Sequence, residues 1–311
     1  MKKISILIPC YNEEENVIQI AKAIENVLIK NCSGYDYEIC FIDNCSQDNT
    51  RSLIRELCKQ NHKIKAIFNA RNFGQFNSPF YGITQLTGDC VIPICCDFQD
   101  PVEMLPEMIS EWENGAKIVS CIKTKSDENP FIRFLRTIYY KLIYKMSEVE
   151  QIEHFTGFGL YDKSFVDVLR NLHDPTPFIR GIVAELGFNR VNLPYRQAKR
   201  KAGKTHNNWY SLFDAAMLSF TSYTKAIMRF ASIGGFIASF FSFAIAIFYF
   251  VQKLLHWNSM SMGLAPLVIG VFFLGSIQIF FLGFLGEYIM NMNKRIMNRP
   301  LVIEQERINW E

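Results

Sequence analysis

The sequence predicts an α/β fold, in which helices cover both faces of a mostly parallel β-sheet and two transmembrane helices follow near the C-terminus. Three observations support this prediction. Short apolar runs alternate with segments of helical periodicity, which is typical of parallel sheets. Several apolar runs end in polar residues, as strands beside a ligand crevice do. Two long stretches near the C-terminus contain no charged residue.

Five apolar runs predict the strands of the sheet. The first contains β-branched residues and stops at Pro9, which is typical of a buried strand. The second ends at Asp43 and the fourth runs into Asp97, so polar side chains follow directly on apolar runs. The predicted strands are 4–8, 37–42, 63–68, 89–94 and 117–122.

Three segments between these strands predict helices. The segment 13–29 has helical periodicity and an acidic first turn. The segment 46–60 begins with Ser46 and Asp48, which are both favoured N-cap residues. The segment 76–86 keeps a helical pattern despite Pro79 near its start.

Composition excludes several classes of protein. The chain has 311 residues, of which 49% are hydrophobic and 20% charged, and a disordered chain would be poorer in apolar residues. The net charge of +3 is too small to indicate a nucleic-acid partner. Nine cysteines, with no secretory signal at the start, indicate free thiols in a reducing cytosol.

The uncharged stretches 230–251 and 264–286 are each long enough to cross a hydrocarbon core of about 30 Å as a helix. The alternative, a pair of buried core helices, fits less well, because ordinary helices average about 11–12 residues. Basic residues flank the pair on its outer sides, which predicts that both termini are cytoplasmic. We therefore expect a multi-pass protein of the inner (cytoplasmic) membrane. The flanking residues are Lys225, Arg229, Lys294, Arg295 and Arg299.

This pattern divides the chain into three parts. Residues 1–228 are predicted to form a cytoplasmic domain, 229–290 the membrane helices and 291–311 a cytoplasmic tail. Within the domain, 131–147 and 208–228 are predicted to be interfacial helices, since the first interleaves basic and apolar residues. For that first helix, packing against the domain's own core explains the pattern equally well.

Polar clusters at four strand ends predict a ligand crevice. Carboxyl ends of parallel strands meet at one edge of a sheet, so these clusters are expected to lie together. The sequence has no GxGxxG, GxxxxGK[ST] or GxSxG motif, so dinucleotide, P-loop and serine-hydrolase chemistry are not indicated. The clusters are Tyr11-Asn12-Glu13, Asp43-Asn44, Arg71-Asn72 and Asp97-Phe98-Gln99-Asp100.

Extended versions of these clusters, in this order and at these spacings, resemble the family 2 inverting glycosyltransferases. The resemblance covers nearly the whole chain. It is closest to the polyprenyl-phosphate group, which includes dolichyl-phosphate-mannose synthase and the bactoprenol glucosyltransferases. It implies a nucleotide-diphospho-sugar transferase (GT-A-like) fold. The segments that carry it are IPCYNEE at 8–14, DNCSQD at 43–48, RNFG at 71–74 and DFQDP at 97–101.

The resemblance implies a role for each matching residue on the donor side. The nucleotide sugar, a UDP- or GDP-sugar, would be held mainly by the first three clusters. Asp97 and Gln99 match the metal motif and would hold Mg²⁺ or Mn²⁺, while Asp97 and Asp100 are the candidate catalytic residues. The donor-binding candidates are Pro9, Tyr11, Asn12, Glu13, Asp43, Arg71, Asp97, Arg200 and Lys204.

On the acceptor side, the resemblance implies a polyprenyl phosphate such as undecaprenyl phosphate. Arg133, Arg136 and Thr205 would receive its phosphate. Structural roles are open for several candidates: Glu13 and Asp43 suit the starts of helices, and Asp97 and Asp100 suit a turn before Pro101.

The chain departs from the family pattern at three places. Cys95 stands where the first aspartate of the metal motif is usual, and a thiol is a poor ligand for a hard cation. Asn44 replaces the second of two aspartates after the second strand. The segment 156–160, TGFGL, lacks an aspartate and an arginine that many relatives have. The acceptor or sugar can therefore differ from that of better-known members.

The implied reaction is inverting transfer of one sugar to a lipid phosphate, supplying modification of a surface polysaccharide. A phosphomonoester is mostly ionised near neutral pH, so no strong general base is needed. Two alternatives are transfer to a hydroxyl of a lipid-linked saccharide, with Asp100 as base, and a non-catalytic nucleotide-sugar-binding membrane protein. Expected partners are membrane lipid, a flippase, a downstream glycosyltransferase and a second copy of the chain, with no nucleic acid.

Overall fold

The structure is a computed structural model. It describes residues 1–125, 152–172, 174–198, 200, 264–297 and 299–310, together with isolated residues between 233 and 255. The predicted helices at 131–147 and 208–228, and most of the stretch 230–251, lie outside the described residues.

Among the described residues, eight strands form one sheet. They are β1 (Lys3–Cys10), β2 (Asp36–Asp43), β3 (Ile64–Asn69), β4 (Cys90–Pro93), β5 (Ile118–Lys125), β6 (Phe155–Asp162), β7 (Arg190–Arg196) and β8 (Glu304–Ile308). The strand order is β7-β5-β6-β4-β1-β2-β3-β8. The four central strands are parallel, whereas β8 pairs antiparallel with β3 and β6 pairs antiparallel with both β4 and β5.

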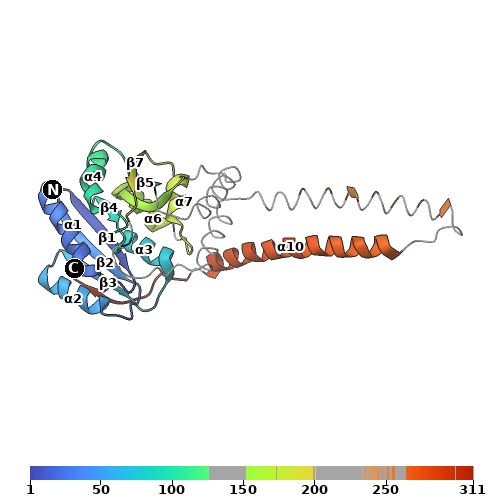
Figure 1. Ribbon diagram of the computed structural model, residues 1–311, viewed down its shortest axis with the longest axis horizontal. Coiled ribbons are helices and arrows are strands. Elements are labelled where there is room, and N and C mark those ends of the chain that lie inside the picture. The colour runs from blue at the N-terminus through green and yellow to red at the C-terminus, as the bar shows by residue number, and fades with distance from the viewer. Residues whose placement is uncertain are drawn as a thin grey trace.

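Helices cover both faces of this sheet (Figure 1). They are α1 (Val17–Asn31), α2 (Thr50–Gln60), α3 (Gly74–Gln85), α4 (Leu105–Glu113), α6 (Lys163–Asn171) and α7 (Ile179–Glu185), with a 3₁₀ turn at Val102–Met104. Alternate residues of β1 face opposite sides: Ile6 and Ile8 belong to the core under α1, α2 and α4, and Leu7 to the core under α3, α6 and α7. The predicted α/β class and mostly parallel sheet are confirmed.

All five predicted strands and all three predicted helices of the first 125 residues are present. Their ends differ by a few residues. The first helix begins at Val17 rather than at residue 13, because Glu13–Asn16 form a turn in which the Asn16 N–H donates to the Glu13 carbonyl (3.0 Å). The second begins at Thr50, whose N–H donates to the Asp48 carboxylate (3.0 Å).

A long helix, α10 (Leu264–Met297), extends away from the sheet, and the chain then returns to place β8 beside β3 (Figure 1). The uncharged stretch 264–286 is only part of α10, which continues through Glu287, Lys294 and Arg295. Across the described residues, no helix combines the length and apolar character that crossing a membrane requires. The expected multi-pass inner-membrane location is therefore corrected.

The segment 156–160 lies in β6, and its second glycine is explained by close packing. A Cβ at Gly159 would lie 2.1 Å from the carbonyl oxygen of Val119 in the neighbouring strand β5. The backbone oxygen has no room to withdraw, since Val119 is fully buried.

We expect Gly159→Ala to destabilise the fold by about 3 kcal/mol, because the added methyl group overpacks the contact between β5 and β6. Chemical denaturation of the purified chain measures this change. Gly34→Ala is the matched control, because no atom lies within 4 Å of a Cβ at that position. Equal stabilities of the two variants would contradict the packing argument.

Candidate active site at the carboxyl edge of the sheet

Polar loops follow β1, β2, β3 and β4 at one edge of the sheet. The chain passes from β1 through β2 to β3 on one side and then places β4 on the other side of β1. Such a switch point, outside the carboxyl ends of parallel strands, is where open α/β sheets bind ligands. Three non-glycine residues in these loops, Asn12, Cys45 and Phe98, have left-handed φ angles of 55°, 67° and 61°. Strained backbone of this kind gathers at functional sites.

Hydroxyl and amide side chains join the loops after β1 and β2. The N–H of Asn12 donates to Ser46 Oγ and the N–H of Glu13 to Thr50 Oγ1, both at 2.9 Å. Asn12 Oδ1 in turn accepts from the Gln47 N–H (2.8 Å). Asn12, predicted to bind the donor, therefore fixes the loop geometry.

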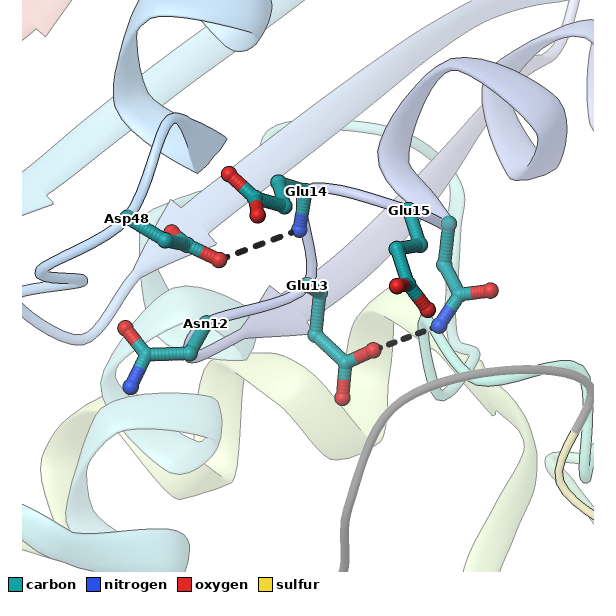
Figure 2. Close-up of a pocket in the computed structure, with 6 residues that line it drawn as sticks. Asn12, Glu13, Glu14, Glu15 and Asp48 are labelled. Atoms are coloured by element: carbon teal, nitrogen blue, oxygen red, sulfur yellow. Dashed lines mark hydrogen bonds between the residues drawn. The ribbon is translucent and has the colours of Figure 1, made fainter.

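Beside this junction lies a small acidic pocket lined by Asn12, Glu13, Glu14, Glu15, Asn16 and Asp48. Figure 2 shows the Glu14 N–H donating to Asp48, and Asn16 Nδ2 donating to Glu13 Oε2 (2.7 Å). The four carboxylates make this pocket unsuitable for a phosphate group.

Asp43 lies at the end of β2 with no exposed surface. Its Oδ2 accepts from Arg51 Nε (2.6 Å) and from the N–H of Cys45 (3.1 Å). The N–H of Ser46 also donates to this carboxylate. Asp43 thus organises its own loop and binds a guanidinium group.

Sequence reasoning did not single out Arg51, although one signal was available. Arg51 lies in the first turn of α2, where the helix dipole disfavours a cation unless an anion lies beside it. Its Nη2 also donates to the Asn69 carbonyl at the end of β3 (2.5 Å), so Arg51 joins the ends of two neighbouring strands.

Three asparagines shape the loop after β3. Asn44 Nδ2 donates to Asn72 Oδ1 (2.8 Å), and Asn44 Oδ1 accepts from Asn69 Nδ2 (3.2 Å). Asn72 Oδ1 also accepts from the N–H of Gly74, whose φ of 90° suits glycine (2.8 Å). Arg71 is exposed in this loop, with its guanidinium carbon 4.2 Å from the ring centre of Phe73.

Arg200 joins two of the predicted site residues across the switch point. Its Nη2 lies 2.8 Å from Asp97 Oδ2, and its Nη1 lies 3.5 Å from Glu13 Oε1. Asp97 follows β4 and Glu13 follows β1, and both are nearly buried. The structure therefore brings together Glu13, Asp97 and Arg200, which are far apart in the sequence.

Asp97 and Asp100 adopt different positions within one turn. Asp97 Oδ1 accepts from the N–H of Gln99 (3.1 Å) and Asp97 Oδ2 is directed to Arg200. Asp100 is buried and its Oδ2 accepts from the N–H of Cys95 (3.0 Å). Burial, aided by the charge of Asp97, raises the pKa of Asp100 to about 6, although its bonds to Cys95 and Tyr195 oppose the shift.

The other predicted site residues are placed as follows. Pro9, Tyr11 and Gln99 are partly buried at this edge of the sheet. Arg133, Arg136, Lys204 and Thr205 lie outside the described residues. The predicted metal ligands Asp97 and Gln99 are two residues apart in one turn, and both offer oxygen, the donor that Mg²⁺ and Mn²⁺ prefer. In the part of the chain that the structure describes, no three His, Cys, Asp or Glu side chains gather as a metal cluster.

Comparison with known proteins places these residues in a family. Residues 5–170 match the family described as "Glycosyl transferase family 2". The chain belongs to this family. The SfII prophage-derived bactoprenol glucosyl transferase of Shigella flexneri is 32% identical over 305 residues, covering 97% of each chain. The prophage bactoprenol glucosyl transferase homolog of Escherichia coli K12 is 30% identical over 304 residues, covering 97% of this chain and 98% of the relative.

The chain is therefore a glycosyltransferase, and the resemblance predicted from its motifs is confirmed. Among solved structures, it is similar to the mannosyltransferase PcManGT from Pyrobaculum calidifontis in complex with GDP-Man and Mn²⁺. That similarity has 15% sequence identity and a TM-score of 0.48, and it covers 96% of this chain and 86% of the other.

The raised pKa of Asp100 predicts a pH effect on stability. Because this pKa is about 6 in the folded protein and about 3.9 in the unfolded chain, the stability that Asp100 contributes is complete below about pH 4 and is lost as the pH rises through about 6. Asp100→Asn removes this dependence. We expect its stability relative to the wild type to rise by roughly 3 kcal/mol between about pH 4 and pH 7.5.

Denaturant unfolding of both proteins at the two pH values measures this difference. Asp167→Asn, at a half-exposed carboxylate on α6, is the control and should show little change. If the Asp100→Asn variant and the wild type differ equally at both pH values, Asp100 does not have the raised pKa.

Proposed function

We propose that this glycosyltransferase moves one sugar, with inversion, from a UDP- or GDP-sugar to a polyprenyl phosphate. The observation that carries the proposal is the position of Arg200 between Asp97 and Glu13 at the switch point of the sheet. It places a cation beside the edge where such sheets bind ligands, and a donor diphosphate needs a cation there.

The donor nucleotide would lie across the ends of β1, β2 and β3. Pro9, Tyr11 and Glu13 would line its base and ribose, and Asp43 would accept a hydrogen bond from the base. Arg71 is exposed at the outer side of the same edge, where its guanidinium group suits an anionic or polar part of the nucleotide. These loops lie together at one edge of the sheet, which supports the donor-binding roles that the motifs suggested.

The proposed acceptor rests on the relatives and on the burial and hydrogen bonding of Asp100. Both bactoprenol relatives match this chain along nearly their whole length, which supports a polyprenyl phosphate. Asp100 is buried and bound to the Cys95 N–H, so it is poorly placed to take a proton from an acceptor hydroxyl. A phosphate oxygen is already ionised near neutral pH and needs no such base.

Asp97 and Gln99 would hold Mg²⁺ or Mn²⁺ beside the donor diphosphate. One carboxylate and one amide oxygen are sufficient when phosphate oxygens and water complete the coordination. When bound, the cation neutralises charge that develops on the leaving nucleoside diphosphate. Arg200, with Lys204, would contact the same diphosphate, whereas Arg133, Arg136 and Thr205 would contact the acceptor phosphate.

We expect purified full-length chain to form a lipid-phosphate sugar from undecaprenyl phosphate and one member of a panel of UDP- and GDP-sugars. The reaction would run in detergent with Mg²⁺ or Mn²⁺, and mass spectrometry would identify the product. Asp97→Asn should lower kcat/KM by about 100-fold or more, because it removes charge from the reacting centre.

Asp167→Asn makes the same chemical change at a half-exposed carboxylate on α6 and should leave the rate unaltered. Circular dichroism would establish that both variants fold. Sugar transfer to a lipid-linked saccharide, with none to the lipid phosphate, would replace the proposed acceptor. Full activity of Asp97→Asn would remove Asp97 from the reacting centre.

A further inference from the structure

The C-terminal strand β8 begins beside the donor side of the site. It adds antiparallel to β3, with Glu306 opposite Phe68 and Glu304 opposite Asn69. Gln305 is therefore the extra residue of a β-bulge. Bulges occur beside active sites, where they redirect a side chain. This strand lies outside residues 5–170, which match the family.

The bulged residue contacts the arginine that binds Asp43. Gln305 Oε1 accepts a hydrogen bond from Arg51 Nη1 (3.0 Å). The other two nitrogens of that guanidinium group donate to Asp43 Oδ2 (2.6 Å) and to the Asn69 carbonyl (2.5 Å). Because a guanidinium group is planar and rigid, three bonds in three directions fix both its position and its rotation. Gln305 supplies the third bond.

Other contacts hold the C-terminal segment in place independently of Gln305. The Ile303 carbonyl accepts from the N–H of Ala70 (2.9 Å), directly before Arg71. Asn309 Nδ2 donates to the carbonyls of Cys58 and Ile64, each at 2.8 Å. Trp310 Nε1 donates to the Ala66 carbonyl (3.2 Å). A substitution at Gln305 should therefore leave β8 attached to the sheet.

We propose that Gln305 is a positioning residue for the donor nucleotide: it orients Arg51, and Arg51 in turn holds Asp43 in the geometry that binds the base. The proposal rests on the proposed function, in which Asp43 contacts the nucleotide. It makes the C-terminal strand a part of the donor site, although its own side chains need not touch the ligand.

The test measures binding of UDP and GDP to the full chain by calorimetry, and the donor KM and kcat of the transferase reaction. Gln305→Met keeps the length of the side chain but removes the acceptor oxygen. We expect it to weaken nucleotide binding and raise the donor KM about fivefold with kcat unchanged, as for the loss of one ordinary hydrogen bond. Gln305→Glu keeps an acceptor oxygen and should restore wild-type values.

Glu306→Gln is the matched control. It removes an ion pair with Arg55 from the next residue of the same strand, without touching Arg51. It should leave the donor KM unchanged, whereas a merely structural role for the strand would move KM in both variants. In an Arg51→Met background, Gln305→Met should have no further effect on nucleotide binding, because Gln305 acts through Arg51.

Two outcomes would overturn the proposal while leaving the proposed function intact: wild-type nucleotide affinity of Gln305→Met, or an equal loss of affinity whether or not Arg51 is present. Absence of nucleotide binding by the wild type would instead reject the proposed donor, and the role of Gln305 with it.

Discussion

The ion pair between Asp43 and Arg51 is the contact on which the donor side of the site depends. Asp43 has no exposed surface, and a buried carboxylate is tolerated only when it is paired and hydrogen-bonded. Arg51 meets that need and also binds the end of β3 and the bulge of β8. Removal of Arg51 would leave an unpaired buried charge, a change that costs about 3–5 kcal/mol in other proteins. Arg51, in the first turn of α2, therefore joins the ends of β2 and β3 to the bulge of β8.

Arg200 has a similar role on the other side of β1, where it also joins two loops. Arg200 contacts Glu13 after β1 and Asp97 after β4, whereas Arg51 contacts Asp43 after β2 and the backbone after β3. The parallel sheet brings these four loops to one edge, and the two arginines stabilise the carboxylates gathered there. The loops themselves are fixed by hydroxyl and amide side chains such as Ser46, Thr50 and Asn44.

Local patterns were sufficient to predict the central strands, the first three helices and the clustering of the polar loops. Pairings between distant segments were not predictable in this way. β8, with the sequence EQERI, has no apolar run, and it forms a strand because it docks on the edge of β3. The pairing of Arg200 with Asp97 is likewise set by the fold. The membrane location was wrong, since no helix among the described residues is long and apolar enough to cross a membrane; the stretch 264–286 is part of α10, which extends to Met297. Arg51 could have been found, since a cation in the first turn of a helix requires an anionic partner.

The replacement of the usual aspartate by Cys95 fits the charge balance of the site. Cys95 contributes its backbone N–H to the buried carboxylate of Asp100, whereas the carboxylate of Asp97 pairs with Arg200. Among Glu13, Asp97 and Arg200, negative charge exceeds positive charge by one. A donor diphosphate would add to this excess, whereas a divalent cation held by Asp97 and Gln99 would offset it. This charge balance supports the proposal that Mg²⁺ or Mn²⁺ would accompany the donor.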